Sequence, residues 1–259
     1  MKKLVVVVSA CMLMAVGSKA QGRLEAGFRF NPQFTAILNK EDADAGNELN
    51  PETHFTARSF GVGFMYNISN SIGLGADVLF SREGQAFSGY ITGTSVNQEA
   101  YTAVIDKQTF LNNELVLGDY KALAELNYVK VPVMLSLGSD KSKKVFFSVL
   151  AGPQFNFLVN VAQEVNGKDL EYPYTNIEAK DLYKPVTYSG MLAIGGGLNV
   201  GPHLVLSARL RADYGFTDAE KKDVMISYLG TPSTRFYSTN RGAAHTLTGG
   251  LMIGLDIKI

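Results

Sequence analysis

The feature that most constrains this chain is a strict alternation of apolar and polar residues over long segments. In the segment 203–216, an apolar residue stands at every even position, and Arg209, Arg211 and Asp213 stand between them. A period of two places alternate side chains on opposite faces of a β-strand. The run is 14 residues long, whereas strands of globular proteins usually have about five or six. Such length favours the wall of a membrane barrel over a soluble sheet.

Seven further segments repeat this alternation, and with 203–216 they make eight predicted strands. They are 23–30, 59–66, 73–80, 128–137, 145–157, 188–199 and 246–259. Pro132 interrupts the fourth of them, and because proline cannot donate to a ladder we expect a bulge or kink there. The polar faces carry Gly and Ser as well as charge, which suits the crowded interior of a narrow barrel.

The connections between these segments alternate between short and long. The short ones are 67–71, 138–144 and 200–202, and the long ones are 32–56, 82–125, 160–186 and 217–244. Short turns on one side and long loops on the other are typical of outer-membrane barrels. We therefore predict an all-β fold, an eight-stranded antiparallel up-and-down transmembrane β-barrel with short periplasmic turns and long extracellular loops. Part of 100–126 could instead form a short helix at the mouth.

The N-terminal segment has the pattern of a secretory signal. Lys2 and Lys3 precede an apolar run at 4–16, and the segment 18–20 places small residues around a cleavage site after Ala20. The run is too short for a transmembrane helix, which needs about 20 apolar residues. We therefore expect a signal peptide at 1–20 and one outer-membrane barrel domain at 21–259.

A second interpretation of this segment is lipidation, because residues 8–11 resemble a lipobox that ends at Cys11. That cleavage would leave the apolar residues 12–16 on the mature protein, so the signal-peptide interpretation is preferred. Cys11 is the only cysteine, so the mature chain has neither a disulfide framework nor a thiolate metal site. The 24 basic and 24 acidic residues balance, and loss of three lysines with the signal leaves a net charge of −3. A nucleic-acid partner is not expected, because no basic stripe is present.

Four segments carry a resemblance to a known family. They are 80–85, 126–135, 151–155 and the closing 249–259. On these residues the chain resembles the PorT-like outer-membrane β-barrel proteins of Bacteroidota, Gram-negative bacteria in which such chains are often labelled porin-family proteins. The most specific element is Tyr128-x-x-x-Pro132, where the family often has a glutamate and this chain has Lys130. The resemblance implies an outer-membrane barrel. It also implies a link to a protein secretion system, with which the founding member is associated.

The C-terminus resembles an outer-membrane assembly signal. Gly254, Ile257 and Ile259 match its spacing of glycine and two apolar residues, with Ile in place of the more familiar terminal Phe. A final strand with a free backbone edge can be recruited by strand addition. We therefore expect the barrel-assembly machinery to be a partner during insertion into outer-membrane lipid.

The polar faces of the predicted strands carry a set of charges that would point into the lumen. An eight-stranded barrel is only wide enough for side chains to fill its interior, and buried charges must be paired. Two interpretations follow, an ion-pair plug that holds the barrel shut and the selectivity lining of a narrow or gated pore. The first and last strands should bring Arg23 and Glu25 close to Asp256 and Lys258 across the seam. The full set is Arg23, Glu25, Arg29, Asp77, Lys130, Arg209, Arg211, Asp213, Asp256 and Lys258.

Enzymatic chemistry has little support in the sequence. His54 and His245 could lie near the outer rim with Ser59 and Ser238, but no spacing motif supports a catalytic triad, and His203 belongs to a periplasmic turn. The glycines at 195–197 lack the Lys-Ser/Thr of a phosphate loop, and no metal or cofactor motif is present.

Three functional hypotheses remain from the sequence. The leading one is a non-enzymatic outer-membrane barrel with a structural or partner-binding role through its extracellular loops. The second is a small or gated pore for ions or solutes. The third is a component that assists a protein secretion system, with an extracellular or secretion-system protein as the partner.

Overall fold

The computed structural model describes residues 24–44, 50–91, 118–167, 174–178, 180–221, 227–228, 231–232 and 242–259. The predicted signal peptide with Cys11, the lumen candidate Arg23 and the candidate hydroxyl partner Ser238 lie outside these residues.

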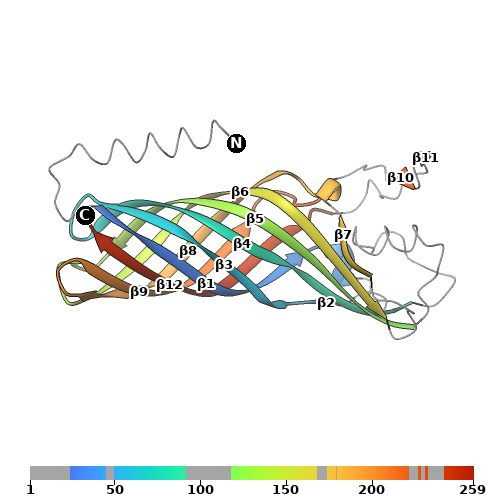
Figure 1. Cartoon of the computed structure of the whole chain (residues 1–259), viewed down its shortest axis with the longest axis horizontal. Coiled ribbons are helices and arrows are strands. Elements are labelled where there is room, and N and C mark those ends of the chain that lie inside the picture. The colour runs from blue at the N-terminus through green and yellow to red at the C-terminus, as the bar shows by residue number, and fades with distance from the viewer. Residues whose placement is uncertain are drawn as a thin grey trace.

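Eight long strands close into a barrel, which confirms the predicted fold class (Figure 1). Each strand pairs antiparallel with the next, and the last pairs with the first, so the sheet has no free edge across the membrane. Closure satisfies every backbone group without water, as a lipid environment demands. The strands are β1 (Leu24–Leu38), β3 (His54–Asn67), β4 (Ile72–Ile91), β5 (Gly118–Gly138), β6 (Val145–Gly167), β8 (Val186–Val200), β9 (Leu204–Gly215) and β12 (His245–Lys258).

Shorter elements lie at the end of the barrel away from the C-terminus (Figure 1). β2 (Asn50–Glu52) pairs with β4, β7 (Tyr174–Glu178) pairs with β6, and β10 (Ser227–Tyr228) pairs with β11 (Thr231–Pro232). Two short helices complete the described elements, α2 (Lys40–Asp44) and the 3₁₀ helix η2 (Lys180–Leu182). Neither is long and apolar enough to cross a membrane, and the same holds for every helix in the described part of the chain.

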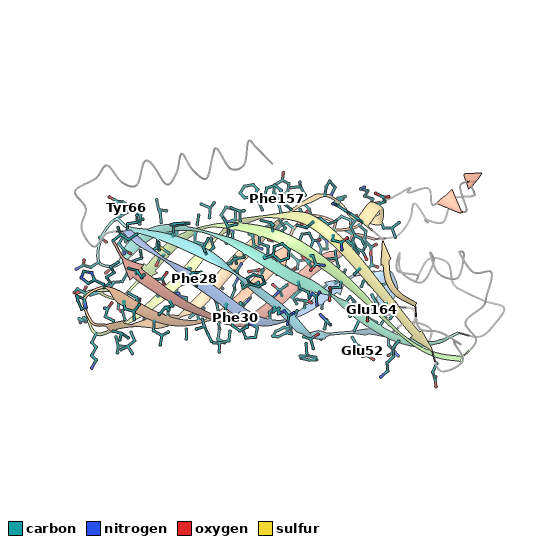
Figure 2. The ribbon with its side chains drawn as sticks, in the orientation of Figure 1. Phe28, Phe30, Glu52, Tyr66, Phe157 and Glu164 are labelled. Carbon is teal, nitrogen blue, oxygen red and sulfur yellow. The ribbon has the colours of Figure 1, made fainter. Side chains whose placement is uncertain are left out.

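The barrel wall is apolar outside and polar inside. Phe28 and Leu210 are 71% and 70% exposed, whereas Asp77 and Lys130 are 1% and 3% exposed. Figure 2 shows Phe28, Phe30 and Phe157 on the outer face of the wall. This is the reverse of a soluble protein, and it matches a strand pattern of apolar-out and polar-in in lipid.

The turns and loops agree with the prediction on one side only. The short turns 68–71, 139–144 and 201–203 are present as expected, at the end where the backbone N–H of Ile259 donates to the carbonyl of Leu24. Three predicted loops are too long, because β1 continues to Leu38, β4 to Ile91 and β6 to Gly167, and β5 begins at Gly118. Residues 118–126 are therefore strand and not helix, and 100–117 lie outside the described residues. The membrane pattern ends there because Ala122, Ala124 and Leu126 bring apolar side chains to the inner face of β5, while the backbone pairing continues.

The irregularity of β5 lies elsewhere than predicted. The β5–β6 register shifts between Asn127 and Tyr128. No shift occurs at Pro132, because Pro132 and Leu135 pair with β6 in the same register. Only the two residues between them are unpaired with β6. The prediction of a bulge at Pro132 is therefore wrong. Pro132 points into the lumen within an unshifted ladder, and the missing donor only leaves a gap in the pairing.

Candidate functional site in the barrel lumen

The polar face of the wall brings the predicted charges together in the lumen. Eight of the ten candidates are buried and Lys258 is half-buried, while Arg23 is outside the described residues. The buried eight are Glu25, Arg29, Asp77, Lys130, Arg209, Arg211, Asp213 and Asp256. Seven of them form two clusters. The inner cluster lies nearer the short turns and consists of Arg29, Asp77, Arg209 and Asp256. The outer cluster lies nearer the long connections and consists of Lys130, Arg211 and Asp213, together with Glu83.

The inner cluster is centred on Arg29 of β1. Its Nη1 donates to Asp256 Oδ1 of β12 at 2.5 Å, and its Nε lies 3.7 Å from Asp77 Oδ1 of β4. Neither carboxylate oxygen of Asp77 accepts a hydrogen bond. Arg29 therefore links three strands across the seam, but it satisfies only Asp256 well.

Two glycines on the inner face make room for this cluster. A Cβ at Gly63 would collide with Asp77 Oδ1 and stand 2.8 Å from Arg29 Nε, and a Cβ at Gly254 would stand 2.5 Å from Ser207 Oγ. Only residues without a side chain leave the guanidinium this space in a narrow lumen. Arg29 can therefore occupy this position only because Gly63 and Gly254 have no side chains.

Arg209 is the second arginine of the inner cluster, and it has no carboxylate partner in the described part of the chain. Its Nε donates to Ser148 Oγ at 3.1 Å and its Nη1 donates to Ser207 Oγ at 2.9 Å. Although it lacks an ion pair, Arg209 is buried, with only 8% of its surface exposed. A buried cation held by hydroxyl groups alone is a weaker arrangement than an ion pair.

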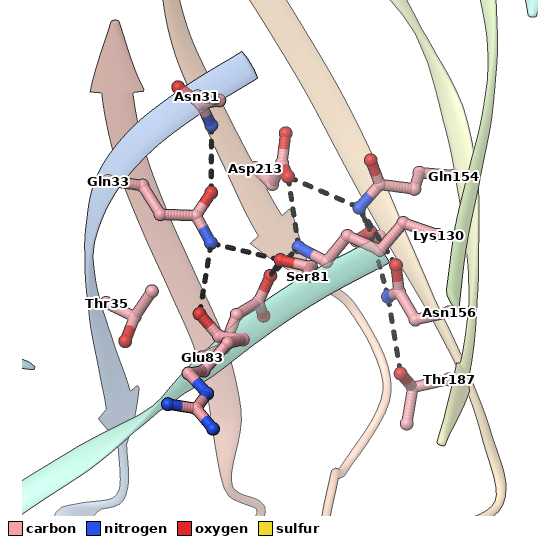
Figure 3. Close-up of polar contacts among 12 residues, drawn as sticks. Asn31, Gln33, Thr35, Ser81, Glu83, Lys130, Gln154, Asn156, Thr187 and Asp213 are labelled. Atoms are coloured by element: carbon pink, nitrogen blue, oxygen red, sulfur yellow. Dashed lines mark hydrogen bonds and ion pairs between the residues drawn. The ribbon is translucent and has the colours of Figure 1, made fainter. Parts of the chain in front are cut away.

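Both cations of the outer cluster have carboxylate partners, and Figure 3 shows those of Lys130. Lys130 of β5 forms ion pairs with Glu83 of β4 and with Asp213 of β9, the latter at 3.2 Å. Arg211 grips the same Asp213 with two bonds, Nε to Oδ1 at 2.9 Å and Nη2 to Oδ2 at 3.2 Å. Such bidentate pairs are the strong form of charge-assisted hydrogen bond. Two carboxylates, those of Glu83 and Asp213, therefore balance the two cations of the outer cluster.

Amide and hydroxyl groups extend the outer cluster to the rest of the wall (Figure 3). On one side, Gln154 accepts from Arg211 Nη2 at 2.5 Å and donates to Asp213 Oδ2 at 3.3 Å and to Ser189 Oγ at 2.9 Å. On the other side, Gln33 donates to Ser81 Oγ at 3.0 Å, and Ser81 donates to Glu83 at 2.7 Å. The network spans the lumen from β1 to β8.

Apolar side chains fill the lumen beside these clusters. A methionine layer joins six buried residues, and Arg211 Nη1 lies 3.8 Å from the sulfur of one of them, Met252. Methionine is flexible enough to fill irregular gaps between fixed polar groups. The layer consists of Met65, Met134, Leu150, Met191, Ala193 and Met252.

A cap of loop residues closes the end with the long connections. Leu182, the last residue of η2, and Tyr183, the next residue, are 3% and 1% exposed and pack with buried residues of β1, β5 and β6. Backbone hydrogen bonds anchor the cap, from Leu158 N to the carbonyl of Pro185 and from Lys184 N to that of Ala219, both at 2.9 Å. The apolar cluster under it is Ile37, Leu126, Tyr128, Leu158, Val161, Leu182, Tyr183 and Ala244.

The turn 139–144 lies at the opposite end of the barrel and contributes Lys141 to the hydrogen bonds at the seam. Glu25 and Lys258 are register partners, but no ion pair joins them. Glu25 accepts from Asn67, which accepts from Lys141 Nζ at 2.6 Å, and Lys258 Nζ donates to Asn199 Oδ1 at 2.7 Å. Burial lowers the pKa of Lys141 below its usual value. The register therefore brings Glu25 close to Lys258 across the seam as predicted, although each side chain hydrogen-bonds to an asparagine. The ion pair across the seam is Arg29–Asp256.

Several lumen residues were missed by the sequence reasoning. Glu83 fell in a segment taken for a loop, although Ser81, Glu83 and Gln85 continue the inward face of β4, and this alternation was the available signal. Leu182 and Tyr183 carry no such signal, since a cap that folds back depends on tertiary packing.

The histidines do not assemble a catalytic group in the described part of the chain. His54 Nε2 lies 3.3 Å from Thr56 Oγ1, and His245 Nδ1 lies 2.9 Å from the carbonyl of Gly215. Ser59 is buried on the inner face and contacts neither of them. Among the described residues, no three His, Cys, Asp or Glu side chains come together to hold a metal ion.

Comparison with known proteins gives a family match and distant structural neighbours. A family model for an outer membrane protein beta-barrel domain matches residues 18–220. OprG of Pseudomonas aeruginosa is 10% identical over 91% of this chain and 94% of its own, with a TM-score of 0.42. Neisserial surface protein A is 11% identical over 93% and 100%, with a TM-score of 0.41, and the outer membrane protease OmpT of Escherichia coli is 8% identical over 93% and 98%, with a TM-score of 0.38. A search of curated protein sequences gave no significant match.

Proposed function

The chain belongs to the outer membrane protein beta-barrel domain family, and we propose that it is a closed, non-enzymatic barrel that presents its extracellular strands to a partner. The observation that carries this proposal is the filling of the lumen at successive levels. The inner cluster, the methionine layer, the outer cluster and the cap all consist of buried side chains. A lumen so filled leaves the extracellular end as the surface available for function.

The strands that extend beyond the membrane support the partner-binding role. β4, β5 and β6 have 20, 21 and 23 residues, whereas about 9 to 11 residues cross a bilayer. The excess length forms a paired sheet outside the membrane, with Glu52 and Glu164 at its end (Figure 2). A rigid projecting sheet is a better platform for a partner than a set of isolated loops.

The finer identity belongs to the same proposal. We infer a PorT-like protein of Bacteroidota, made with a signal peptide cleaved after Ala20 and a barrel domain at 21–259. Gly254, Ile257 and Ile259 would form the signal read by the barrel-assembly machinery. In the structure Ile257 and Ile259 are exposed and Gly254 faces inward, which fits a strand presented by its edge and its apolar face. A secretion-system protein is one candidate for the extracellular partner.

A gated pore is the second candidate function, and one observation favours it. Arg209 has no carboxylate partner in the described part of the chain, and Asp77 accepts no hydrogen bond. Incompletely satisfied charges are the kind that line an ion pathway. For conduction, however, both the outer cluster and the cap would have to move.

Single-channel recording in planar bilayers separates the two functions. We expect the refolded mature protein to be silent, and Leu182→Ala/Tyr183→Ala to remain silent because the outer cluster still closes the lumen. Insertion is checked by protease protection, and Arg209→Gln is recorded beside Arg209→Ala/Arg211→Ala in case the double variant fails to insert. Stable conductance steps in the wild type whose ion selectivity changes in Arg209→Gln would replace this proposal with the pore.

Site-specific cross-linking on intact cells tests the partner-binding role. The mature chain has no cysteine of its own. A cysteine introduced at position 164 is therefore the single site in the protein to which a photo-reactive group can be attached. We expect a discrete protein adduct from Glu164→Cys and none from Lys143→Cys in the opposite turn. Equal absence of adducts from both positions, at equal surface labelling of Glu164→Cys, would contradict a protein partner at this end.

A further inference from the structure

Two arginines face outward from adjacent strands of the barrel wall. Arg58 of β3 and Arg82 of β4 are directly opposed in the antiparallel register. Both are exposed on the outer surface, Arg82 with 45% of its side chain accessible. Like charges directly opposite each other across two strands are destabilising, so this pair requires a compensating charge.

The protein supplies only part of that charge. Glu125 of β5 forms an ion pair with Arg82, with Arg82 Nε 2.9 Å from Glu125 Oε1. Among the described residues, Arg58 makes no hydrogen bond or ion pair, and its register partners are Pro32 of β1 and Arg82 of β4. One positive charge is therefore left over at this place on the outer wall.

The pair lies where the apolar wall ends. On the outer face, the next register pair toward the short turns is Phe60–Phe80, whose ring centroids are 6.0 Å apart, and both rings are exposed to the lipid side. Across the neighbouring strands, the register partner of Arg82 on β5 is Asn127, and that of Asn127 on β6 is Asn160. Aromatic residues mark the level of the headgroups in membrane barrels, so the two guanidinium groups stand at that level in the outer leaflet.

We propose that Arg58 and Arg82 bind the phosphate of an outer-leaflet lipid whose acyl chain lies along Phe60 and Phe80. Guanidinium groups match phosphate oxygens in a planar, bidentate geometry, and they do so with less dehydration than an ammonium group. The phosphate removes the like-charge repulsion of the pair, and the exposed rings below provide the apolar surface for the chain. The lumen and the extracellular partner play no part in this site.

Lipid retention measured by native mass spectrometry tests the proposal. The full chain is reconstituted in phosphatidylcholine vesicles that contain either phosphorylated lipid A or the same lipid after phosphatase treatment, and is then extracted in mild detergent. We expect the wild type to retain the phosphorylated lipid and to lose the dephosphorylated one. Each arginine should contribute about tenfold to retention, as hydrogen bonds to charged groups do, and Arg58→Gln/Arg82→Gln should reduce it to the level of the dephosphorylated lipid.

Two further variants test whether lipid retention depends on the charges at this site and not on the total charge of the protein. Lys143→Gln/Lys144→Gln removes the same charge from an exposed turn at the opposite end and should leave retention unchanged. Glu125→Gln removes the competing carboxylate and should strengthen retention by several fold. Folding of each variant is checked by heat-modifiable mobility on gels. Equal retention of both lipids by the wild type, or equal retention by wild type and a folded Arg58→Gln/Arg82→Gln variant, would overturn the proposal.

Discussion

The two charge clusters in the lumen are built from the same residue types but are satisfied to different degrees. In the outer cluster, Glu83 and Asp213 balance Lys130 and Arg211, and Gln154 accepts from Arg211 Nη2. In the inner cluster, Asp77 accepts no hydrogen bond and Arg209 rests on two serine hydroxyls. Both clusters are buried to a similar extent.

The difference shows that burial alone does not define a structural ion-pair network. A fully satisfied network fixes its members in one arrangement, whereas a partly satisfied one leaves charge that other groups could complete. The outer cluster therefore holds the strands β4, β5 and β9 in place. The inner cluster is held as much by the space at Gly63 and Gly254 as by its own bonds.

The largest expected effect is that of Asp213→Asn in the outer cluster. The change leaves Lys130 and Arg211 buried with Glu83 as the only remaining carboxylate partner. Breaking a buried pair costs about 3 to 5 kcal/mol, and we expect a loss of that size in the free energy of unfolding, measured by urea titration in vesicles. A loss below about 1 kcal/mol, the range of an exposed pair, would mean that the outer cluster is no tighter than the inner one.

A smaller effect is expected from Gly63→Ala in the inner cluster. The new methyl group collides with Asp77 Oδ1 and stands 2.8 Å from Arg29, so both side chains must move. We expect about 1 to 3 kcal/mol of destabilisation, as for other overpacked sites. Gly73→Ala on β4 is the control, because its nearest neighbour is the flexible sulfur of Met65 at 3.0 Å. Equal losses in the two variants would show that the inner cluster does not depend on the space at Gly63.

The sequence predicted the wall and the contents of the lumen better than the pairing within it. Alternation fixed which face each of Arg29, Asp77 and Arg211 takes, because a strand offers only two faces. It could not tell that Lys130 would find Glu83 and Asp213, since those partners come from strands that are distant in the chain. The carboxylates of Glu83 and Asp213 accommodate the ammonium group of Lys130 in the lumen.

The limits of the strands and the cap escaped prediction for a related reason. Beyond the membrane the inner face of β5 is apolar, with Ala122, Ala124 and Leu126 buried, so the apolar-out and polar-in pattern of a membrane strand ends while the hydrogen-bonded ladder continues. Leu182 and Tyr183 lie in a connection, and only the packed structure shows that they fold back over the lumen. The alternation along each strand was therefore enough to predict the barrel wall. The cap over the lumen depends on contacts between residues that are distant in the sequence, and it could not be predicted in this way.

Asp77→Asn should have a much smaller effect than Asp213→Asn, although both carboxylates are buried. Asp77 has no donor to lose, and Arg29 keeps its 2.5 Å bond to Asp256. We expect a change within about 1 kcal/mol, the size of an ordinary hydrogen-bond contribution, in the same urea titration. Equal losses from the two variants would remove the distinction between the clusters.

The smallest expected effect concerns Lys141, in the turn below the inner cluster. Burial lowers its pKa from the usual 10.5, so the folded protein releases this proton at a lower pH than the unfolded chain does. Below the lowered pKa the penalty for burying the charge is fully present, and between that pKa and 10.5 the stability of the wild type should rise with pH. Because the group is only partly buried, we expect a rise of about a few tenths of a kcal/mol. The readout is the difference in the pH dependence of unfolding between the wild type and Lys141→Met, with Lys143→Met in the same turn as the control. If Lys141→Met keeps the wild-type slope, the ammonium group of Lys141 is solvated, and the turn does not seal the end of the lumen below the inner cluster.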